Sequence, residues 1–318
     1  MPTPLRIIYF GTPDFAVASL NVLVENGYDI AAVVTAPDKP AGRGQKLRQT
    51  AIKVYAEEKG LTVLQPQKLK SEEFIKQLKE LNANLQIVVA FRMLPEVVWN
   101  MPEIGTFNLH GSLLPQYRGA APINWAIING ETETGATTFF LKHEIDTGQV
   151  IFQEKISIGE NDNAGKIHDQ LMDVGAGLVL KTVQAIEVND YPKTEQSELL
   201  IGEPKHAPKI FKDTCRIDWS KSINVIHNHI RGVSPYPAAW TELQIGDKTL
   251  VLKVFETKKE IAAHTKPIGE VVIEDKEFKV AVTGGYINIV SLQLAGKKRM
   301  LTKDFLLGFK ADTNLVVI

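Results

Sequence analysis

Three polar side chains with the groups that acyl transfer needs lie in two short segments. Asn108 and His110 lie in the segment Thr-Phe-Asn-Leu-His at 106–110, and Asp146 lies in His-Glu-Ile-Asp-Thr-Gly at 143–148. Alternate residues of a strand point to one face, so the amide and the imidazole would converge on one point. An amide donor and a protonated imidazole suit an oxyanion developing on a carbonyl, and the carboxylate could hold that proton or relay one through water. These residue types predict acyl transfer to an amine.

Each segment also has a structural interpretation. Asn108 and His110 could bond to nearby loops from a strand end, and Asp-Thr-Gly is a turn-favouring string. A covalent nucleophile is not expected, because Ser112 lacks the Gly-x-Ser-x-Gly context and Cys215 lies beyond the α/β region. This single cysteine excludes an intramolecular disulfide and multi-cysteine metal sites. The seven histidines have no cysteine partners, so we expect no metal.

A glycine-containing loop, residues 37–48, is the third candidate segment. From Lys39 to Ala56 the chain has five basic residues and no acidic one. A cationic loop at the carboxyl edge of a sheet is well placed for a phosphate backbone. The alternative is a solvated surface loop, although loops this long in a compact domain are usually functional or disordered.

Composition and missing motifs narrow the class of protein. The 318 residues are 44% hydrophobic and 23% charged, without a segment resembling a membrane span or signal peptide, so we expect a cytoplasmic protein. The first glycine turn, residues 11–16, lacks the three spaced glycines of nicotinamide and flavin enzymes, and no phosphate-binding loop occurs. The net charge is about −6 over residues 1–200 and about +5 over residues 201–318, weak support for an anionic partner.

Hydrophobic patterning predicts the elements that position these residues. Strand-like runs alternate with helical patterns up to about residue 188, which predicts an open, mostly parallel, Rossmann-like α/β domain. The expected strands cover residues 5–10, 30–34, 61–64, 85–90, 106–109, 136–141 and 150–156, and the expected helices cover 13–26, 50–59, 71–81, 122–129 and 164–188. In that arrangement Asn108 and His110 lie at the carboxyl end of a strand, where such sheets bind ligands.

The remainder of the chain has a different pattern. A polar, proline-bearing segment suggests a linker, and beyond it a helix near 223–230 precedes short alternating runs. Those runs, at 239–245, 249–255, 269–273, 279–282 and 286–292, predict a small β-barrel. We therefore expect a catalytic domain over 1–189, a linker over 190–209 and a barrel over 210–318.

Taken together, these segments resemble the methionyl-tRNA formyltransferase family over nearly the whole chain. The similar strings are Gly-Thr-Pro-Asp-Phe-Ala at 11–16, the loop 37–47, His-Gly-Ser-Leu-Leu-Pro at 110–115, Arg-Gly-Ala-Ala-Pro-Ile at 118–123, Asp-Thr-Gly at 146–148, Arg-Ile-Asp-Trp at 216–219 and Leu-Ala-Gly-Lys-Lys at 294–298. The catalytic strings are shared with other enzymes that use 10-formyltetrahydrofolate. The second domain resembles the OB-fold-like barrel that this family uses against initiator tRNA.

The resemblance implies roles for particular residues. It makes Asn108, His110 and Asp146 catalytic. It implies folate binding by Val89, Ala90, Phe91, Ser112, Leu113, Leu114 and Pro115, and tRNA binding by Lys39, Arg43, Lys46, Arg48, Lys209, Lys297 and Lys298. The donor would be 10-formyltetrahydrofolate, the acceptor methionyl initiator tRNA, and the protein a monomer acting without metal or membrane. The alternatives are formylation of an amino sugar nucleotide and RNA binding without catalysis.

The chain departs from the family pattern in two places. The loop at residues 89–95 is shorter than the usual tyrosine-glycine version, which affects the detail of the folate pocket. The basic loop has Lys39 and Gln45 where arginine and lysine are frequent, so fewer contacts to tRNA are expected there.

Overall fold

The computed structural model describes residues 4–41, 46–309 and 315–318. Its contacts group into two compact units. The first comprises residues 1–119, 135–156 and 168–206, and the second comprises 120–134, 157–167 and 207–318. These units are defined by contacts within the folded chain. The expected domain boundaries at residues 189 and 210 describe parts that would fold on their own, and they stay a prediction.

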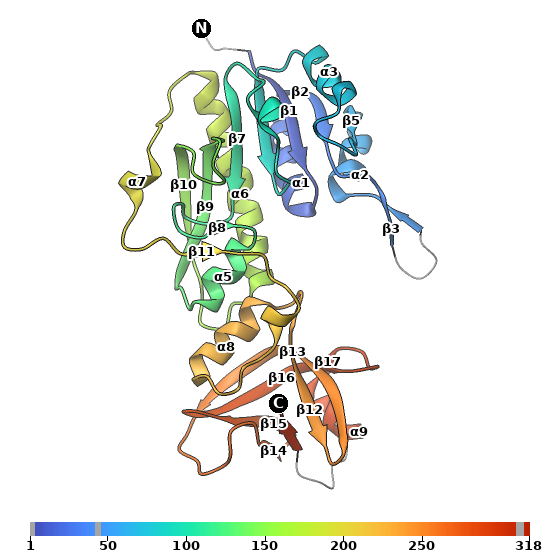
Figure 1. Ribbon diagram of the computed structural model, residues 1–318, viewed down its shortest axis with the longest axis vertical. Coiled ribbons are helices and arrows are strands. Elements are labelled where there is room, and N and C mark those ends of the chain that lie inside the picture. The colour runs from blue at the N-terminus through green and yellow to red at the C-terminus, as the bar shows by residue number, and fades with distance from the viewer. Residues whose placement is uncertain (1–3, 42–45, 310–314) are drawn as a thin grey trace. The chain divides into compact units, whose positions relative to one another are not determined.

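A seven-stranded sheet forms the centre of the first unit, in the order β10-β9-β7-β6-β1-β2-β5. The strands are β1 (Arg6–Gly11), β2 (Asp29–Val34), β5 (Val63–Leu64), β6 (Leu85–Val89), β7 (Gly105–His110), β9 (Glu133–Phe140) and β10 (Val150–Ser157). The five strands from β7 to β5 pair in parallel, and β9 runs antiparallel to β7. The expected mostly parallel Rossmann-like sheet is confirmed (Figure 1).

Helices cover both faces of this sheet. The helices of the first unit are α1 (Asp14–Glu25), α2 (Ala51–Glu58), α3 (Glu72–Glu80), α4 (Glu96–Trp99), α7 (Gln196–Leu199) and most of α6 (Ala164–Glu187). On one face, the Tyr9 hydroxyl donates to the Ala16 carbonyl of α1, and Leu109 packs against Gly175 of α6. On the other face, α3 and α4 pack on Phe10 and Val88.

The segment expected as a loop over 37–48 contains a hairpin. Strands β3 (Lys39–Ala41) and β4 (Lys46–Arg48) pair antiparallel, with Lys39 opposite Arg48. The sequence expectation of an irregular loop was wrong here, because two three-residue strands, one containing proline, are too short for a period-two pattern to reveal. Residues 42–45, which follow β3 in the sequence, lie outside the described residues.

The second unit is a nearly closed antiparallel barrel, as expected (Figure 1). Its strand order is β14-β15-β16-β13-β12-β18, and a bridge between Glu270 and Val316 links the two ends. The strands are β12 (Ala239–Ile245), β13 (Lys248–Ile261), β14 (Val271–Glu274), β15 (Glu277–Val282), β16 (Gly285–Leu294) and β18 (Leu315–Val317), with β17 (Met300–Leu301) paired to β16. Val254, Ile287 and Leu292 lie in its core.

Three helices and a short 3-10 turn belong to the barrel unit. They are α5 (Pro122–Ile128), α8 (Ile223–Gly232), α9 (Thr302–Gly308) and the turn Asp213–Cys215. The Asn124 amide donates to the Gly232 carbonyl at 2.7 Å, and Gly232 lies close against Ile128. A side chain at position 232 would collide with Ile128, so glycine permits the close packing of α5 on α8. The remaining strands, β8 (Arg118–Gly119) and β11 (His206–Ala207), have two residues each. Within the described residues, no helix is long and apolar enough to span a membrane.

Candidate active site

Strand β7 places Asn108 and His110 on one face of the sheet. The register puts Asn108 between Val88 of β6 and Phe139 of β9, and puts His110 opposite Thr137. His110 is buried, with 7% of its surface exposed, whereas Asn108 is half-buried. Phe10 and Val88 lie on the same face, and α3 and α4 cover the part of the sheet beside them. The two polar side chains therefore stand at the edge of an apolar layer, at the carboxyl end of the strand.

A main-chain carbonyl fixes the orientation of the His110 ring. Nε2 lies 2.9 Å from the carbonyl oxygen of Tyr117, and the ring packs edge-on against Phe139 with centroids 6.4 Å apart. Since a carbonyl only accepts, Nε2 carries the hydrogen. Among the described residues Nδ1 has no hydrogen-bond partner. It is thus the ring atom left for a reacting group, as an acceptor in the neutral imidazole and a donor in the imidazolium.

Asp146 lies on the loop between β9 and β10 and bonds to the same segment as His110. Its Oδ2 accepts from the Gly119 amide at 3.1 Å, two residues after the carbonyl that holds His110. Asp146 has a φ of +55°, a left-handed conformation that aspartate adopts more readily than most residues. The structure thus connects the segment with Asp146 to the segment with Asn108 and His110 through residues 117–119.

A buried glutamine, which sequence reasoning missed, ties this loop in place. Gln196 Nε2 donates to the carbonyls of Asp146 at 2.8 Å and Gly148 at 2.9 Å, while its Oε1 accepts two bonds from the Arg118 guanidinium. A Cβ at position 148 would lie 1.5 Å from the Phe140 carbonyl oxygen, so only glycine fits there. Gln196 falls in the polar stretch 190–209, where composition suggested a linker and gave no signal of a buried role.

The predicted folate segment, residues 112–115, packs beside His110 through Thr137. The Thr137 hydroxyl donates to the Ser112 carbonyl at 2.6 Å and accepts from the Leu114 amide at 3.1 Å. Gln153 Nε2 donates to the Leu114 carbonyl at 2.8 Å. Ser112, Leu114 and Pro115 are buried, whereas Leu113 is half-buried. The polar groups of this main chain are therefore largely engaged within the protein, and the segment is held beside β7.

The other predicted folate positions follow β6. Val89 pairs with Leu109, so its buried side chain faces away from Asn108. Ala90 is exposed with a φ of +47°, and the Phe91 ring lies 5.6 Å from that of Phe10. Of these three, the Phe91 ring lies against Phe10, on the face that carries Asn108.

The root of the β3–β4 hairpin is fixed by charged and amide groups. The Lys53 ammonium lies 2.6 Å from Asp38 Oδ2, and Gln65 Nε2 donates to Asp38 Oδ1 at 2.8 Å and to the Ala36 carbonyl. The hydrogen bonds from Lys53 and Gln65 lower the pKa of the Asp38 carboxyl. The hydroxyls of Thr35 and Thr50 bond to each other at 2.9 Å across the base. The hairpin consequently leaves the sheet in a defined direction.

The basic residues predicted to meet tRNA lie on both units. Lys39 and Arg48 are exposed on the hairpin strands, and Lys46 begins β4. Arg43 lies outside the described residues. Lys209, Lys297 and Lys298 are exposed in the barrel unit.

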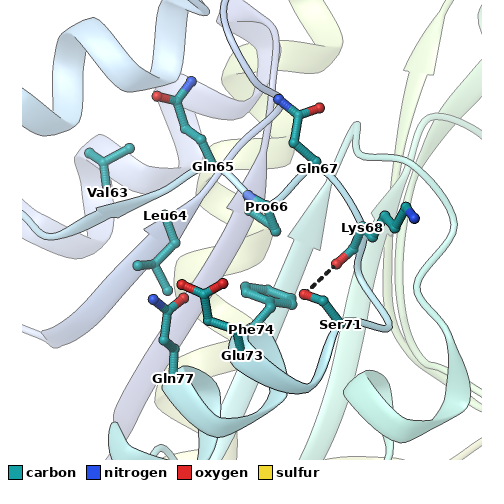
Figure 2. Close-up of a pocket in the computed structure, with 10 residues that line it drawn as sticks. All are labelled: Val63, Leu64, Gln65, Pro66, Gln67, Lys68, Ser71, Glu73, Phe74 and Gln77. Atoms are coloured by element: carbon teal, nitrogen blue, oxygen red, sulfur yellow. Dashed lines mark hydrogen bonds between the residues drawn. The ribbon is translucent and has the colours of Figure 1, made fainter.

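A separate pocket of about 470 Å³ lies between the end of β5 and α3 (Figure 2). Its lining is Val63, Leu64, Gln65, Pro66, Gln67, Lys68, Ser71, Glu73, Phe74 and Gln77. The Arg92 guanidinium donates to the carbonyls of Pro66 and Gln67 at its rim. None of the predicted catalytic or folate-binding residues lines it, and only Gln65 connects it to the hairpin root. No group of three or more His, Cys, Asp or Glu side chains suited to a metal occurs among the residues described.

Family models and curated relatives show which family this chain belongs to. A model of the formyl transferase family matches residues 5–183, and a model of the formyl transferase C-terminal domain matches residues 209–310. The chain is 57% identical to a methionyl-tRNA formyltransferase of Bacteroides thetaiotaomicron over 310 residues, 96% of each chain. It is 53% identical to a methionyl-tRNA formyltransferase of Flavobacterium johnsoniae over 304 residues, again 96% of each.

Solved structures with a similar fold include two that hold a folate. One is an N-formyltransferase from Helicobacter canadensis in complex with folinic acid and dTDP-3-aminofucose, with a TM-score of 0.65 and 20% identity, covering 93% of this chain and 100% of that one. The other is HypX from Aquifex aeolicus in complex with tetrahydrofolic acid, with a TM-score of 0.64 and 17% identity, covering 98% of this chain and 49% of that one. At these identities the likeness concerns the fold.

Proposed function

Because this chain belongs to the formyl transferase family, we propose that it transfers a formyl group from 10-formyltetrahydrofolate to the amino group of methionyl initiator tRNA. The observation that carries the proposal is the 57% identity, over 96% of both chains, to a methionyl-tRNA formyltransferase. The matched region includes both the sheet with Asn108 and His110 and the barrel, so the likeness extends beyond the folate-using part.

The proposed reaction is a direct transfer. The methionine nitrogen forms a bond to the formyl carbon, and the bond from that carbon to N10 of the folate breaks after a tetrahedral intermediate. One proton leaves the attacking nitrogen and one reaches N10, so the products are N-formylmethionyl-tRNA and tetrahydrofolate. Asn108 donates from its amide to the oxyanion of the intermediate, as in other preorganised oxyanion sites.

His110 and Asp146 have distinct roles in this proposal. The Tyr117 carbonyl occupies Nε2 of His110, so Nδ1 acts on the substrate and donates to the oxyanion when the ring is protonated. Asp146 is bonded to the same segment through Gly119, where its carboxylate would hold a proton or relay the proton of the amine through water. Gln196 is a positioning residue, because it holds the Asp146 main chain without being proposed to touch substrate.

The basic residues named above are proposed to contact tRNA. Lys39, Arg43, Lys46 and Arg48 would present cations from the hairpin, and Lys209, Lys297 and Lys298 from the barrel. Each phosphate contact adds affinity that falls with salt. We also propose that the protein acts as a cytoplasmic monomer and needs no metal for this chemistry.

One assay separates this function from its alternatives. Labelled 10-formyltetrahydrofolate is offered with methionyl initiator tRNA, uncharged initiator tRNA and an amino sugar nucleotide in parallel. Label in acid-precipitable methionyl-tRNA alone supports the proposal. Label in the sugar nucleotide would favour a sugar formyltransferase, and binding of tRNA without any transfer would favour a non-catalytic RNA-binding protein.

A further inference from the structure

An aromatic surface in the barrel unit, with Phe211 exposed and Trp240 half-buried, is not used by the proposed catalytic site. It consists of Phe211, Trp240 and the cations Lys209, Lys212 and Arg216, here called the aromatic platform. Phe211 is a large apolar side chain with 62% of its surface exposed, and among the described residues its ring has no aromatic partner. The Lys209 ammonium lies 5.4 Å from the centre of that ring.

The second ring of the platform carries two more cations. Lys212 Nζ and the Arg216 guanidinium each lie 5.5 Å from the centre of the Trp240 ring. Arg216 also pairs with Glu242 at 3.3 Å, so its charge is partly offset. Lys209 and Lys212 form no ion pair within the described part of the chain. Apart from Asp213, the turn therefore offers uncompensated positive charge beside exposed aromatic surface.

The platform is rigid because the turn that carries it is hydrogen-bonded to itself and to β12. The Phe211 amide donates to the Thr214 hydroxyl at 3.3 Å, and the Cys215 thiol donates to the Phe211 carbonyl at 3.3 Å. The Trp240 indole Nε1 donates to the Lys212 carbonyl at 2.9 Å. These bonds fix the main chain that carries Phe211 and the indole of Trp240, so less entropy is lost there when a ligand binds.

We propose that the aromatic platform stacks an unpaired nucleotide of the tRNA, with Phe211 as the stacking ring and Lys209 and Lys212 contacting the adjoining phosphates. Aromatic faces flanked by cations are the usual means of binding single-stranded nucleic acid, because every base has a π face and every linkage a negative charge. Paired bases cannot offer their faces, so the platform selects unpaired RNA over duplex. The choice of tRNA as the RNA rests on the proposed function.

The test compares Phe211→Leu with Phe211→Trp in the full chain. Binding is measured to a single-stranded oligoadenylate of about twelve nucleotides and to an RNA duplex of the same length, over a range of salt concentrations. Phe211→Leu should weaken oligoadenylate binding by about tenfold, leave the salt slope unchanged and alter duplex binding by less than about twofold. Phe211→Trp should bind the oligoadenylate as tightly as the unmodified protein does. Lys212→Ala should instead reduce the salt slope by about 0.7, as one lost phosphate contact requires.

A matched control exists in the first unit, where the Lys181 ammonium lies 4.5 Å from the Phe152 ring. Phe152→Leu should leave both RNA affinities unchanged. Equal loss of single-strand and duplex binding in Phe211→Leu, or no loss of either, would overturn the stacking proposal. Formyl transfer to methionyl-tRNA by the unmodified protein is measured alongside. Absence of transfer would contradict the proposed function while leaving the binding comparison intact.

Discussion

The Nε2 atom of His110 donates to the main-chain carbonyl of Tyr117 at 2.9 Å. This bond fixes the ring and leaves Nδ1 without a hydrogen-bond partner among the described residues. Tyr117 has a φ of +60°, and its amide donates to the Lys205 carbonyl, so the carbonyl that holds His110 belongs to a main chain held at both ends. The same segment gives the Gly119 amide to Asp146. The site therefore depends on a short stretch of main chain as well as on its three side chains.

Replacing Gln196 tests whether the loop with Asp146 is held for catalysis. Gln196→Leu removes two bonds to that loop and two from Arg118, so kcat should fall by about tenfold or more while KM for the folate changes little. Gln196→Glu keeps an acceptor for Arg118 but loses the donors to the loop, and it should be similarly slow. The measurement is steady-state formyl transfer with each substrate varied.

Gln149→Leu is the control for Gln196→Leu. Gln149 lies near the same loop and donates to the Glu195 carboxylate at 2.7 Å, without bonding to Asp146. Its replacement should leave kcat within about twofold. Equal effects of the two leucine variants would mean that Gln196 contributes only general stability.

Asp38→Asn tests the root of the hairpin. The substitution removes the charge that pairs with Lys53 and disturbs the bond from Gln65, so the hairpin should lose its fixed direction. We expect KM for methionyl-tRNA to rise by about fivefold or more, with folate affinity unchanged. Glu57→Gln, which removes a weaker contact to the same Lys53 at 3.9 Å, should leave both values near those of the unmodified protein.

His227 should make the stability of the protein depend on pH. Burial, opposed by the bond to the Glu160 carbonyl and reinforced by Arg231 and Lys259, lowers the pKa of His227 to about 4. The unfolded chain takes up a proton near pH 6.5 but the folded chain does not. The stabilisation is therefore complete above about pH 6.5 and is lost as the pH falls toward 4.

Urea unfolding at pH 7 and pH 4.5 checks this expectation. Between these values the unmodified protein should lose on the order of 2 kcal/mol more unfolding free energy than His227→Gln, which cannot titrate. The Thr257 hydroxyl, 2.9 Å from Nδ1, can bond to either side chain. The same pH dependence in both proteins would assign the loss to other groups.

Much of the fold could be predicted because its strands are buried and regular. Leu85–Val89 is a short run that is apolar apart from Gln86, and such a run at this length predicts a strand of a parallel sheet. The placement of Asn108 and His110 on one face followed from the period of the strand alone. The barrel strands could likewise be located from alternation, as in β12.

Other features depend on contacts that the sequence does not encode locally. Residues 120–134 and 157–167 precede the barrel in the chain but pack within its unit. Helix α5 lies against α8, and His227 and Arg231 of α8 bond to main-chain carbonyls within 157–167. Gln196 lies in a polar stretch and yet is buried, since four hydrogen bonds satisfy its amide. The two strands of the β3–β4 hairpin are too short to leave a pattern.

The most direct test of the account is the single-turnover rate of formyl transfer in His110→Ala. The variant is mixed with saturating 10-formyltetrahydrofolate and methionyl initiator tRNA, and N-formylmethionyl-tRNA is followed over time. Removing the group proposed to stabilise the oxyanion should slow this step by at least about a hundredfold, and Asn108→Ala and Asp146→Ala should behave alike. Circular dichroism and folate binding should remain those of the unmodified protein. Near-normal single-turnover rates in these folded, folate-binding variants would contradict the assignment of the active site.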